Sequence, residues 1–207
     1  MKHKRKILTF LLFACLISYH SFSQMGVGLS IIKPSADFAY LFKSAPALEI
    51  YFYDTDPHDQ FQYSYSIGIY KFNMRNDTMP IYRLKNDGNS TTLLPGWQKV
   101  SNYFVFPLGV HSEYRFQESN FSPFAGGDLY LNISWYNNHY AIETVEELDE
   151  SEVNVVFAVM PKIGVYKRLR DDLDITVGFG KAVGLDFNNM TMQSYWKIYF
   201  CLMYDGL

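Results

Sequence analysis

The chain has 207 residues, which suits one domain with a full core or two small domains, and no stretch has the composition of a linker. Aromatic residues make up 18% of the chain, whereas the mean hydropathy is only −0.11. This combination is typical of strands with one apolar face, and no apolar run is long enough to form a membrane-spanning helix.

The N-terminus has the three-part layout of a secretory signal peptide. A basic start, MKHKRK, precedes an apolar run over Ile7–Ile17, and the small residues Ser21 and Ser23 precede a cleavage point at Gln24. We therefore predict a signal peptide over residues 1–23 and a single domain over residues 24–207. An alternative is lipidation of Cys15 at a lipoprotein-type cleavage site, although the bulky neighbour Phe13 argues against it.

Cleavage at Gln24 changes both the cysteine count and the charge. Cys201 becomes the only cysteine, so an intramolecular disulfide is excluded. Four basic residues leave with the signal, which lowers the basic count from 18 to 14 against 21 acidic residues, a net charge of −7. Nucleic acid is therefore not an expected partner.

Eight segments alternate between apolar and polar residues, as strands between two different environments do. The segment YFVFPLGVHSEYRF is the clearest, because every second residue from Phe104 forms an apolar face. The predicted strands are Met25–Ile32, Ala47–Tyr53, Phe61–Phe72, Tyr103–Phe116, Phe121–Tyr136, Val153–Arg168, Leu173–Leu185 and Ser194–Tyr204.

The connections between these strands fall into two kinds. Tight turns follow the second, fourth and sixth strands, whereas long loops follow the first, third and fifth, at Lys33–Pro46, Asn73–Ser101 and Asn137–Glu152. Outer-membrane barrels show long loops at one end and short turns at the other. No segment has a helical period, although Ile142–Glu152 is polar enough for a helical turn or a loop.

The polar face carries balanced charges and many glycines, which suits the crowded interior of a small barrel. Buried charges there must pair, because a lone buried charge is very costly. We predict an interior polar network that contains Glu49, His111, Glu113, Arg115, Asp128, Lys162, Arg168, Asp174 and Lys197.

The apolar face concentrates its aromatic residues near the strand ends, as expected at the two interfaces of a membrane. The belt at the long-loop end contains Phe104, Trp135 and Trp196. The belt at the short-turn end contains Phe52, Phe61, Tyr63, Tyr114, Phe116, Phe121 and Tyr204. We therefore predict an all-β fold, an eight-stranded antiparallel up-and-down transmembrane β-barrel.

The chain resembles the small outer-membrane β-barrel domain family of Gram-negative bacteria, close in architecture to OmpA/OmpX-type barrels. The resemblance lies in YFVFPLGVHSEYRF and in the following SPFAGGDLYLNI, and extends loosely over residues 24–207. It implies the fold and an outer-membrane location more than an activity. Family members usually end on an aromatic residue, whereas here Asp205, Gly206 and Leu207 follow Tyr204.

Candidate sites for chemistry are few. His111 and Glu113 suggest a lipid-modifying enzyme, but the adjacent Ser112 points to the opposite face, so Ser64 or Ser134 would have to supply the hydroxyl. The acidic turn formed by Asp54, Asp56, His58 and Asp59 has no glycine for a calcium loop, and His139 is isolated in a loop, so neither a metal nor another cofactor is expected.

Two loops remain as candidates for surface binding. The acidic residues of the Asn137–Glu152 loop either repel or select partners at the surface or simply form a solvated loop; they are Glu143, Glu146, Glu147, Asp149, Glu150 and Glu152. The longer Asn73–Ser101 loop contains Tyr82 and Trp97, which either bind a partner or pack over the barrel mouth.

We therefore expect a non-enzymatic outer-membrane protein with a structural, assembly or surface-binding role. Its partners would be membrane lipid and, through the loops, envelope or cell-surface proteins. An eight-stranded barrel is filled by its own side chains, so a diffusion pore is not expected. The alternatives are a lipid-modifying enzyme of the same fold and a soluble secreted β-barrel that binds a small ligand.

Overall fold

The computed structural model describes residues 24–55, 59–76, 78–86, 91–142, 145–186 and 192–204. Nine strands of this part of the chain form one antiparallel sheet. They are β1 (Gln24–Ser35), β2 (Ala45–Tyr53), β3 (Phe61–Phe72), β4 (Met79–Asn86), β5 (Thr91–Arg115), β6 (Phe121–Ile142), β7 (Val145–Arg170), β8 (Leu173–Asp186) and β9 (Met192–Tyr204).

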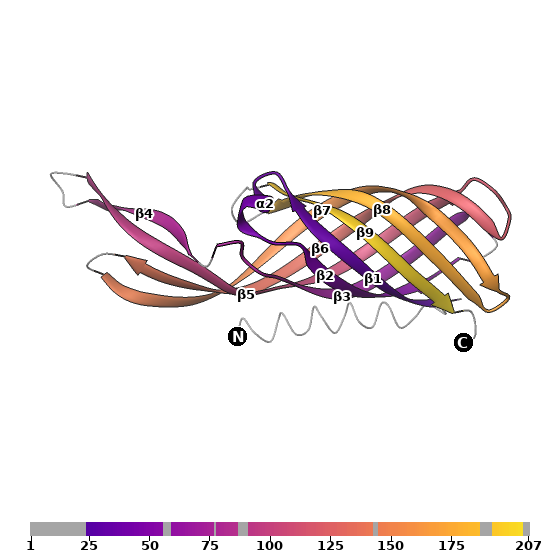
Figure 1. The fold of residues 1–207 in the computed structure, drawn as a ribbon, viewed down its shortest axis with the longest axis horizontal. Coiled ribbons are helices and arrows are strands. Elements are labelled where there is room, and N and C mark those ends of the chain that lie inside the picture. The colour runs from indigo at the N-terminus through magenta and orange to yellow at the C-terminus, as the bar shows by residue number, and fades with distance from the viewer. Residues whose placement is uncertain are drawn as a thin grey trace, which may run out of the picture.

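Eight of these strands close into a barrel (Figure 1). Each pairs with its neighbour in the chain, β1 pairs with β9, and β3 pairs with β5. The strand β4 is left outside the ring, where it pairs with the outer part of β5. The predicted eight-stranded antiparallel barrel is confirmed, with one additional strand beside it.

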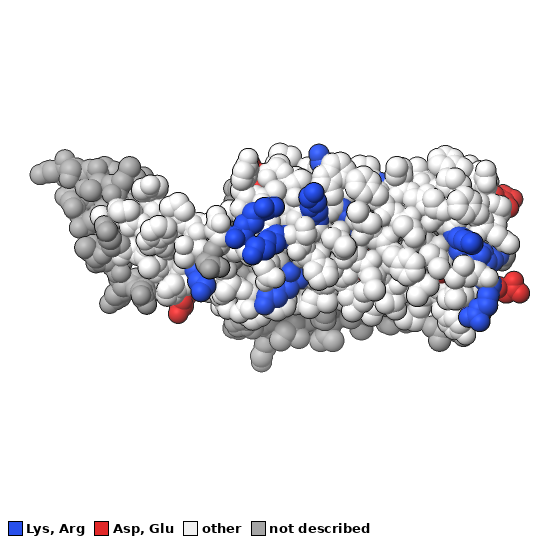
Figure 2. Space-filling view, in the orientation of Figure 1, with Lys and Arg blue, Asp and Glu red and all other residues white. Residues whose placement is uncertain are grey.

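The barrel exposes its apolar face and buries its polar face. On β1, the exposed residues are Val27, Leu29 and Ile31, whereas the alternate residues Gly28 and Ser30 are buried. Figure 2 shows the same pattern from outside, because the charged atoms of the barrel gather near its two ends with an uncharged stretch between them. Hydrocarbon therefore faces this surface, and the alternative of a soluble barrel with an apolar core is wrong.

Two of the predicted long loops are mostly strand. The outer part of β5 pairs with β4 and with β6, and the outer part of β6 pairs with β7. These segments form a sheet, which we call the arm, that projects beyond the barrel rim (Figure 1). The prediction of a helical turn or loop over Ile142–Glu152 is wrong, because β7 begins at Val145.

The first long connection contains the short helix α2 (Phe38–Leu41) at the rim of the barrel. Within the described ranges, no helix has the length and apolar character needed to cross a membrane. The predicted signal peptide, Cys15 and the turn residues Asp56 and His58 lie outside the described residues.

Candidate functional site

The centre of the barrel holds a buried ion network on β5, β6 and β7. The Lys162 ammonium lies 2.6 Å from a Glu113 carboxylate oxygen and 2.7 Å from an Asp128 oxygen. The same Asp128 oxygen lies 2.9 Å from Nδ1 of His111. These side chains come from neighbouring strands whose register places His111 opposite Asp128. One cation therefore bridges two carboxylates, as a buried network requires.

A second buried group joins β2, β9 and β6. Lys197 on β9 pairs with Glu49 on β2 and donates a hydrogen bond of 2.9 Å to the hydroxyl of Tyr130. The Tyr51 hydroxyl donates to the same Glu49 carboxylate at 2.5 Å. Because β9 and β6 are three strands apart in the ring, the contact between Lys197 and Tyr130 crosses the barrel interior and occupies space that a channel would need.

The remaining predicted interior residues lie near the short-turn end. Arg168, which is half-buried, lies 3.4 Å from Asp174 and donates a hydrogen bond to the hydroxyl of Tyr166 at 3.2 Å. Arg115 is buried, and its guanidinium lies 3.5 Å from the centre of the Tyr166 ring. A pocket of about 200 Å³ opens beside these residues, lined also by Asp59 and Glu118. The structure thus divides the nine predicted residues into two central groups and one terminal group.

Glycines make room for the large interior side chains. A Cβ atom on Gly28 would lie 2.6 Å from the ring of Tyr51, and one on Gly178 would overlap the ring of Tyr199. Both tyrosine rings are buried. Small residues therefore stand beside large ones, and the interior is filled by side chains.

Three interior side chains have the spacing of a nucleophile, a base and an acid. The Ser66 hydroxyl lies 2.8 Å from Nε2 of His111, whose Nδ1 faces Asp128. The predicted Ser64 lies opposite His111 in the β3–β5 register, but the hydroxyl bonded to Nε2 belongs to Ser66, and the predicted Ser134 accepts a hydrogen bond from Tyr103 instead. Sequence reasoning missed Ser66, because its position depends on the β3–β5 register, in which Ser66 lies opposite Gly109.

The surroundings of Ser66 leave no room for a substrate. Ser66, His111 and Asp128 are at most 6% exposed. A Cβ atom added at Gly109 would lie 2.6 Å from the Ser66 hydroxyl and 2.7 Å from the His111 ring. Asp128 is also engaged by Lys162. The arrangement has the contacts of a catalytic triad without an approach for an acyl group, which such chemistry requires.

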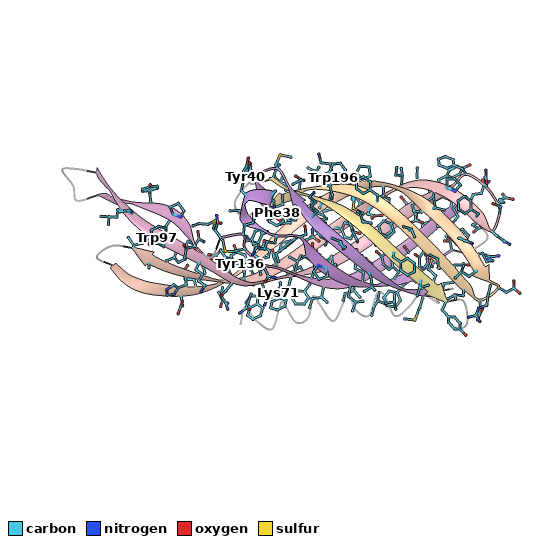
Figure 3. All side chains as sticks on the ribbon, viewed as in Figure 1. Phe38, Tyr40, Lys71, Trp97, Tyr136 and Trp196 are labelled. Carbon is cyan, nitrogen blue, oxygen red and sulfur yellow. The ribbon has the colours of Figure 1, made fainter. Side chains whose placement is uncertain are left out.

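Aromatic side chains close the barrel at the arm end. Phe38 of α2 and Phe42 contact Phe72 of β3, with ring centroids 5.2 and 5.5 Å apart, and Tyr103 stacks on Tyr136 at 4.8 Å. Figure 3 shows Phe38 at this mouth, above Tyr136. The residues that cover the mouth come mainly from α2 and the barrel strands. Tyr82 of β4 and Trp97 of β5 do not cover it, since both lie on the arm and are 70% and 58% exposed, and Figure 3 shows Trp97 there.

The predicted belt residues lie on the outer face. At the arm end, Phe104 stacks with Trp135 at 6.3 Å, and Trp196 stacks with Phe179 at 5.0 Å. Trp135 is exposed, whereas Phe104 and Trp196 are half-buried. At the short-turn end, Phe52 is half-buried and the other members are exposed, namely Phe61, Tyr63, Tyr114, Phe116, Phe121 and Tyr204.

Polar contacts hold the base of the arm. Glu152 on β7 accepts hydrogen bonds from Tyr136 at 2.8 Å and from Asn138 at 2.6 Å, both on β6. Burial, reinforced by Glu152, raises the pKa of Tyr140, so its hydroxyl stays protonated at neutral pH and donates to the same carboxylate. His139 is not isolated in a loop as predicted, because it lies on β6 and Nδ1 is 2.6 Å from Asp149.

Metal binding has no support among the described residues. No group of three or more His, Cys, Asp or Glu side chains in this part of the chain has an arrangement that holds an ion. Asp54 and Asp59 of the predicted acidic turn flank residues 56–58, which lie outside the described ranges. The single cysteine of the described residues, Cys201, is a buried free thiol.

No protein-family model and no curated protein matches the chain. Among solved structures, Neisserial surface protein A is similar, with a TM-score of 0.59 and 12% identity over 88% of this chain and 96% of that one. Ail, the attachment invasion locus protein of Yersinia pestis, has a TM-score of 0.47 and 9% identity over 89% of this chain and 99% of that one. The first likeness shows the fold. The closed barrel and its apolar outer surface make this chain an outer-membrane β-barrel.

Proposed function

We propose that this protein is a non-enzymatic surface protein of the outer membrane, in which the barrel is the anchor and the arm is the element that contacts partners. The observation that carries the proposal is a filled barrel joined to a projecting sheet. The interior ion network and the aromatic rings at the mouth occupy the lumen, which argues against transport of solutes. What remains for interaction with the surroundings is the arm.

The arm has the features of a binding surface. In the described part of the chain, no strand pairs with the outer edge of β4 or with the edge of β7 over residues 145–152. An unpaired edge offers backbone donors and acceptors to an extended segment of another protein. Tyr82 and Trp97 expose large side chains on the arm, and Figure 3 shows Trp97 beyond the barrel rim. Aromatic residues are enriched where proteins bind one another.

Shortening the arm tests this assignment. Replacement of residues 76–100 by a short Gly-Ser turn removes β4 and the outer part of β5 but keeps the barrel strands. We expect the variant to retain the boiling-dependent gel shift of a closed barrel and to lose binding of cells that display it to protein-coated surfaces. Equal binding by the variant and the full chain, at equal surface amounts, would contradict a role for the arm.

The second candidate, a lipid-modifying enzyme, is favoured by the contacts among Ser66, His111 and Asp128. Its test is the lipid composition of membranes that contain Ser66→Ala, His111→Ala or Glu113→Ala variants. We expect the same lipids as with the unsubstituted chain, because the hydroxyl is enclosed. A lipid species that disappears in the Ser66→Ala and His111→Ala membranes would establish the enzyme instead.

A further inference from the structure

Two lysines flank a tryptophan on the outer face of the barrel, near the arm end. Lys33 on β1 and Lys181 on β8 both lie directly opposite Trp196 of β9 in the strand register. Both lysines are exposed, and the neighbouring residues on their strands are buried, so the two side chains share the lipid-facing surface with Trp196. Strands in a sheet are about 4.8 Å apart, which places the two lysine backbones roughly 10 Å apart.

The tryptophan is held in place between the lysines. Its ring stacks on Phe179 with centroids 5.0 Å apart and an angle of 12° between planes. The Lys181 ammonium lies 5.0 Å from the centre of the same ring. Indole rings prefer the boundary between hydrocarbon and headgroups, and lysine stems extend along apolar surface toward the polar side. The three residues therefore lie at the depth of lipid headgroups.

Neither lysine has a carboxylate partner among the described residues. The ion pairs of this part of the chain involve other cations, including Lys162, Lys197 and Arg168. A third lysine at the same rim, Lys71, lies over the belt residue Phe104, 5.2 Å from its ring centre. The positive charges of this rim are thus directed to the membrane surface.

The two ends of the barrel differ in their charge. Exposed basic side chains at the arm end are Lys33, Lys43, Lys71, Arg75, Lys99 and Lys181, and Figure 2 shows basic atoms gathered there. At the short-turn end, acidic residues accompany the basic ones, and Arg170 lies 3.7 Å from Asp172. Asp37 beside α2 is an exposed acidic residue at the same rim, but the basic side chains outnumber it, so the arm end attracts anions.

We propose that Lys33, Trp196 and Lys181 form a binding site for a phosphate-bearing lipid headgroup in the outer leaflet. The two ammonium groups supply charge-assisted hydrogen bonds to phosphate oxygens, and the indole packs against the glycerol or sugar part and the start of the acyl chains. This inference rests on the proposed function, because it requires the arm end of the barrel to face outward in a membrane.

The test uses the full barrel in phosphatidylcholine membranes that contain a minor fraction of phosphatidic acid, whose headgroup is a phosphate monoester. Native mass spectrometry of the extracted protein measures the ratio of the two lipids that it retains. A lysine at an anionic surface contributes about 1 kcal/mol, so Lys33→Gln or Lys181→Gln should each lower the preference for phosphatidic acid about fivefold. The double variant should lower it on the order of 20-fold.

The matched control is the Lys167→Gln, Arg170→Gln double variant, which removes the same charge at the short-turn end. It should keep the preference, as should Lys33→Arg with Lys181→Arg, which retains both cations. The site would be overturned if both double variants lost the preference for phosphatidic acid equally, the one at Lys33 and Lys181 and the one at Lys167 and Arg170. The preference would then come from general charge attraction. Competition by millimolar inorganic phosphate that abolishes lipid retention would overturn the choice of a lipid.

The boiling-dependent gel shift separates the two proposals. A variant that retains the shift is a closed barrel, so a lost preference then reports on the site and not on folding. An unsubstituted chain that lacks the shift would overturn the proposed function itself. A chain that shows the shift but retains both lipids in proportion to their supply would overturn only the headgroup site.

Discussion

The barrel and the arm share strands but face different surroundings. In β6, the barrel part alternates between exposed Leu129 and Leu131 and buried Asp128 and Tyr130. Beyond the rim, residues 139–142 of the same strand are all half-buried. Lipid requires an apolar outer face and permits polar residues only inside, whereas water imposes neither condition. The strand β6 therefore alternates between exposed and buried residues in the barrel, and this alternation stops in the arm.

The largest expected effect comes from the barrel interior. Lys162→Met leaves the Glu113 and Asp128 carboxylates buried without their cation, so we expect the free energy of unfolding to fall by about 3–5 kcal/mol. Urea unfolding in detergent micelles measures this change. Lys43→Met, at an exposed position near the rim, is the control and should change stability little. Similar values for both variants would mean that the interior is hydrated like the outside.

The outer face gives the next effect. Leu129→Arg places a cation in hydrocarbon about midway between Phe121 and Trp135, with an expected cost of about 2–4 kcal/mol. The same residue introduced in the arm, as Tyr82→Arg, should cost less than about 0.5 kcal/mol. Equilibrium folding into vesicles measures both changes. If Leu129→Arg lowered the free energy of unfolding no more than Tyr82→Arg does, the exposed face of β6 would not contact lipid.

Two glycines of the barrel wall differ in the space that surrounds them. A Cβ atom on Gly164 would collide with the Val177 carbonyl and the Phe124 ring, whereas one on Gly127 would have its nearest neighbour 4.0 Å away. Gly164→Ala should therefore destabilise the barrel by about 1–3 kcal/mol. Gly127→Ala should be nearly neutral. Thermal gel-shift midpoints compare the pair, and equal midpoints would count against a closely packed wall.

The smallest effect is expected in the arm. The His139 and Asp149 side chains are 41% and 86% exposed, and exposed ion pairs contribute little. His139→Gln should leave the unfolding free energy within about 0.5 kcal/mol and leave the boiling-dependent shift unchanged. Limited proteolysis of the arm is the sensitive measurement. Loss of the barrel in this variant would show that the arm and the barrel fold as one unit.

How far each region could be predicted from the sequence also depends on whether it faces lipid, as the barrel does, or projects beyond the rim, as the arm does. The barrel strands were predictable because lipid makes alternation strict, as in Phe104–Phe116. The arm was predicted as loops, because Asn137–Glu152 has polar residues on both faces and no alternation to detect. The contact between Ser66 and His111 depends on the pairing of β3 with β5, which skips β4, and no local pattern gives that register.

The aromatic residues that close the barrel mouth were not predicted from the sequence, for a related reason. Phe38 and Phe42 belong to a connection of mixed composition, and their burial depends on the position of Phe72 and Tyr103 at the rim. Of the two alternatives predicted for Tyr82 and Trp97, packing over the mouth is wrong, because both residues are exposed on the arm.

The pairing of β1 with β9 sets the order of events during biogenesis. This seam joins residues 25–35 to residues 194–204, so the ring cannot be completed until residue 204 has been synthesised. Until then, side chains such as Leu29 and Ile198 have no lipid to contact. The newly made chain must therefore be kept from aggregating on its way to the membrane, and its last strand decides when that protection ends.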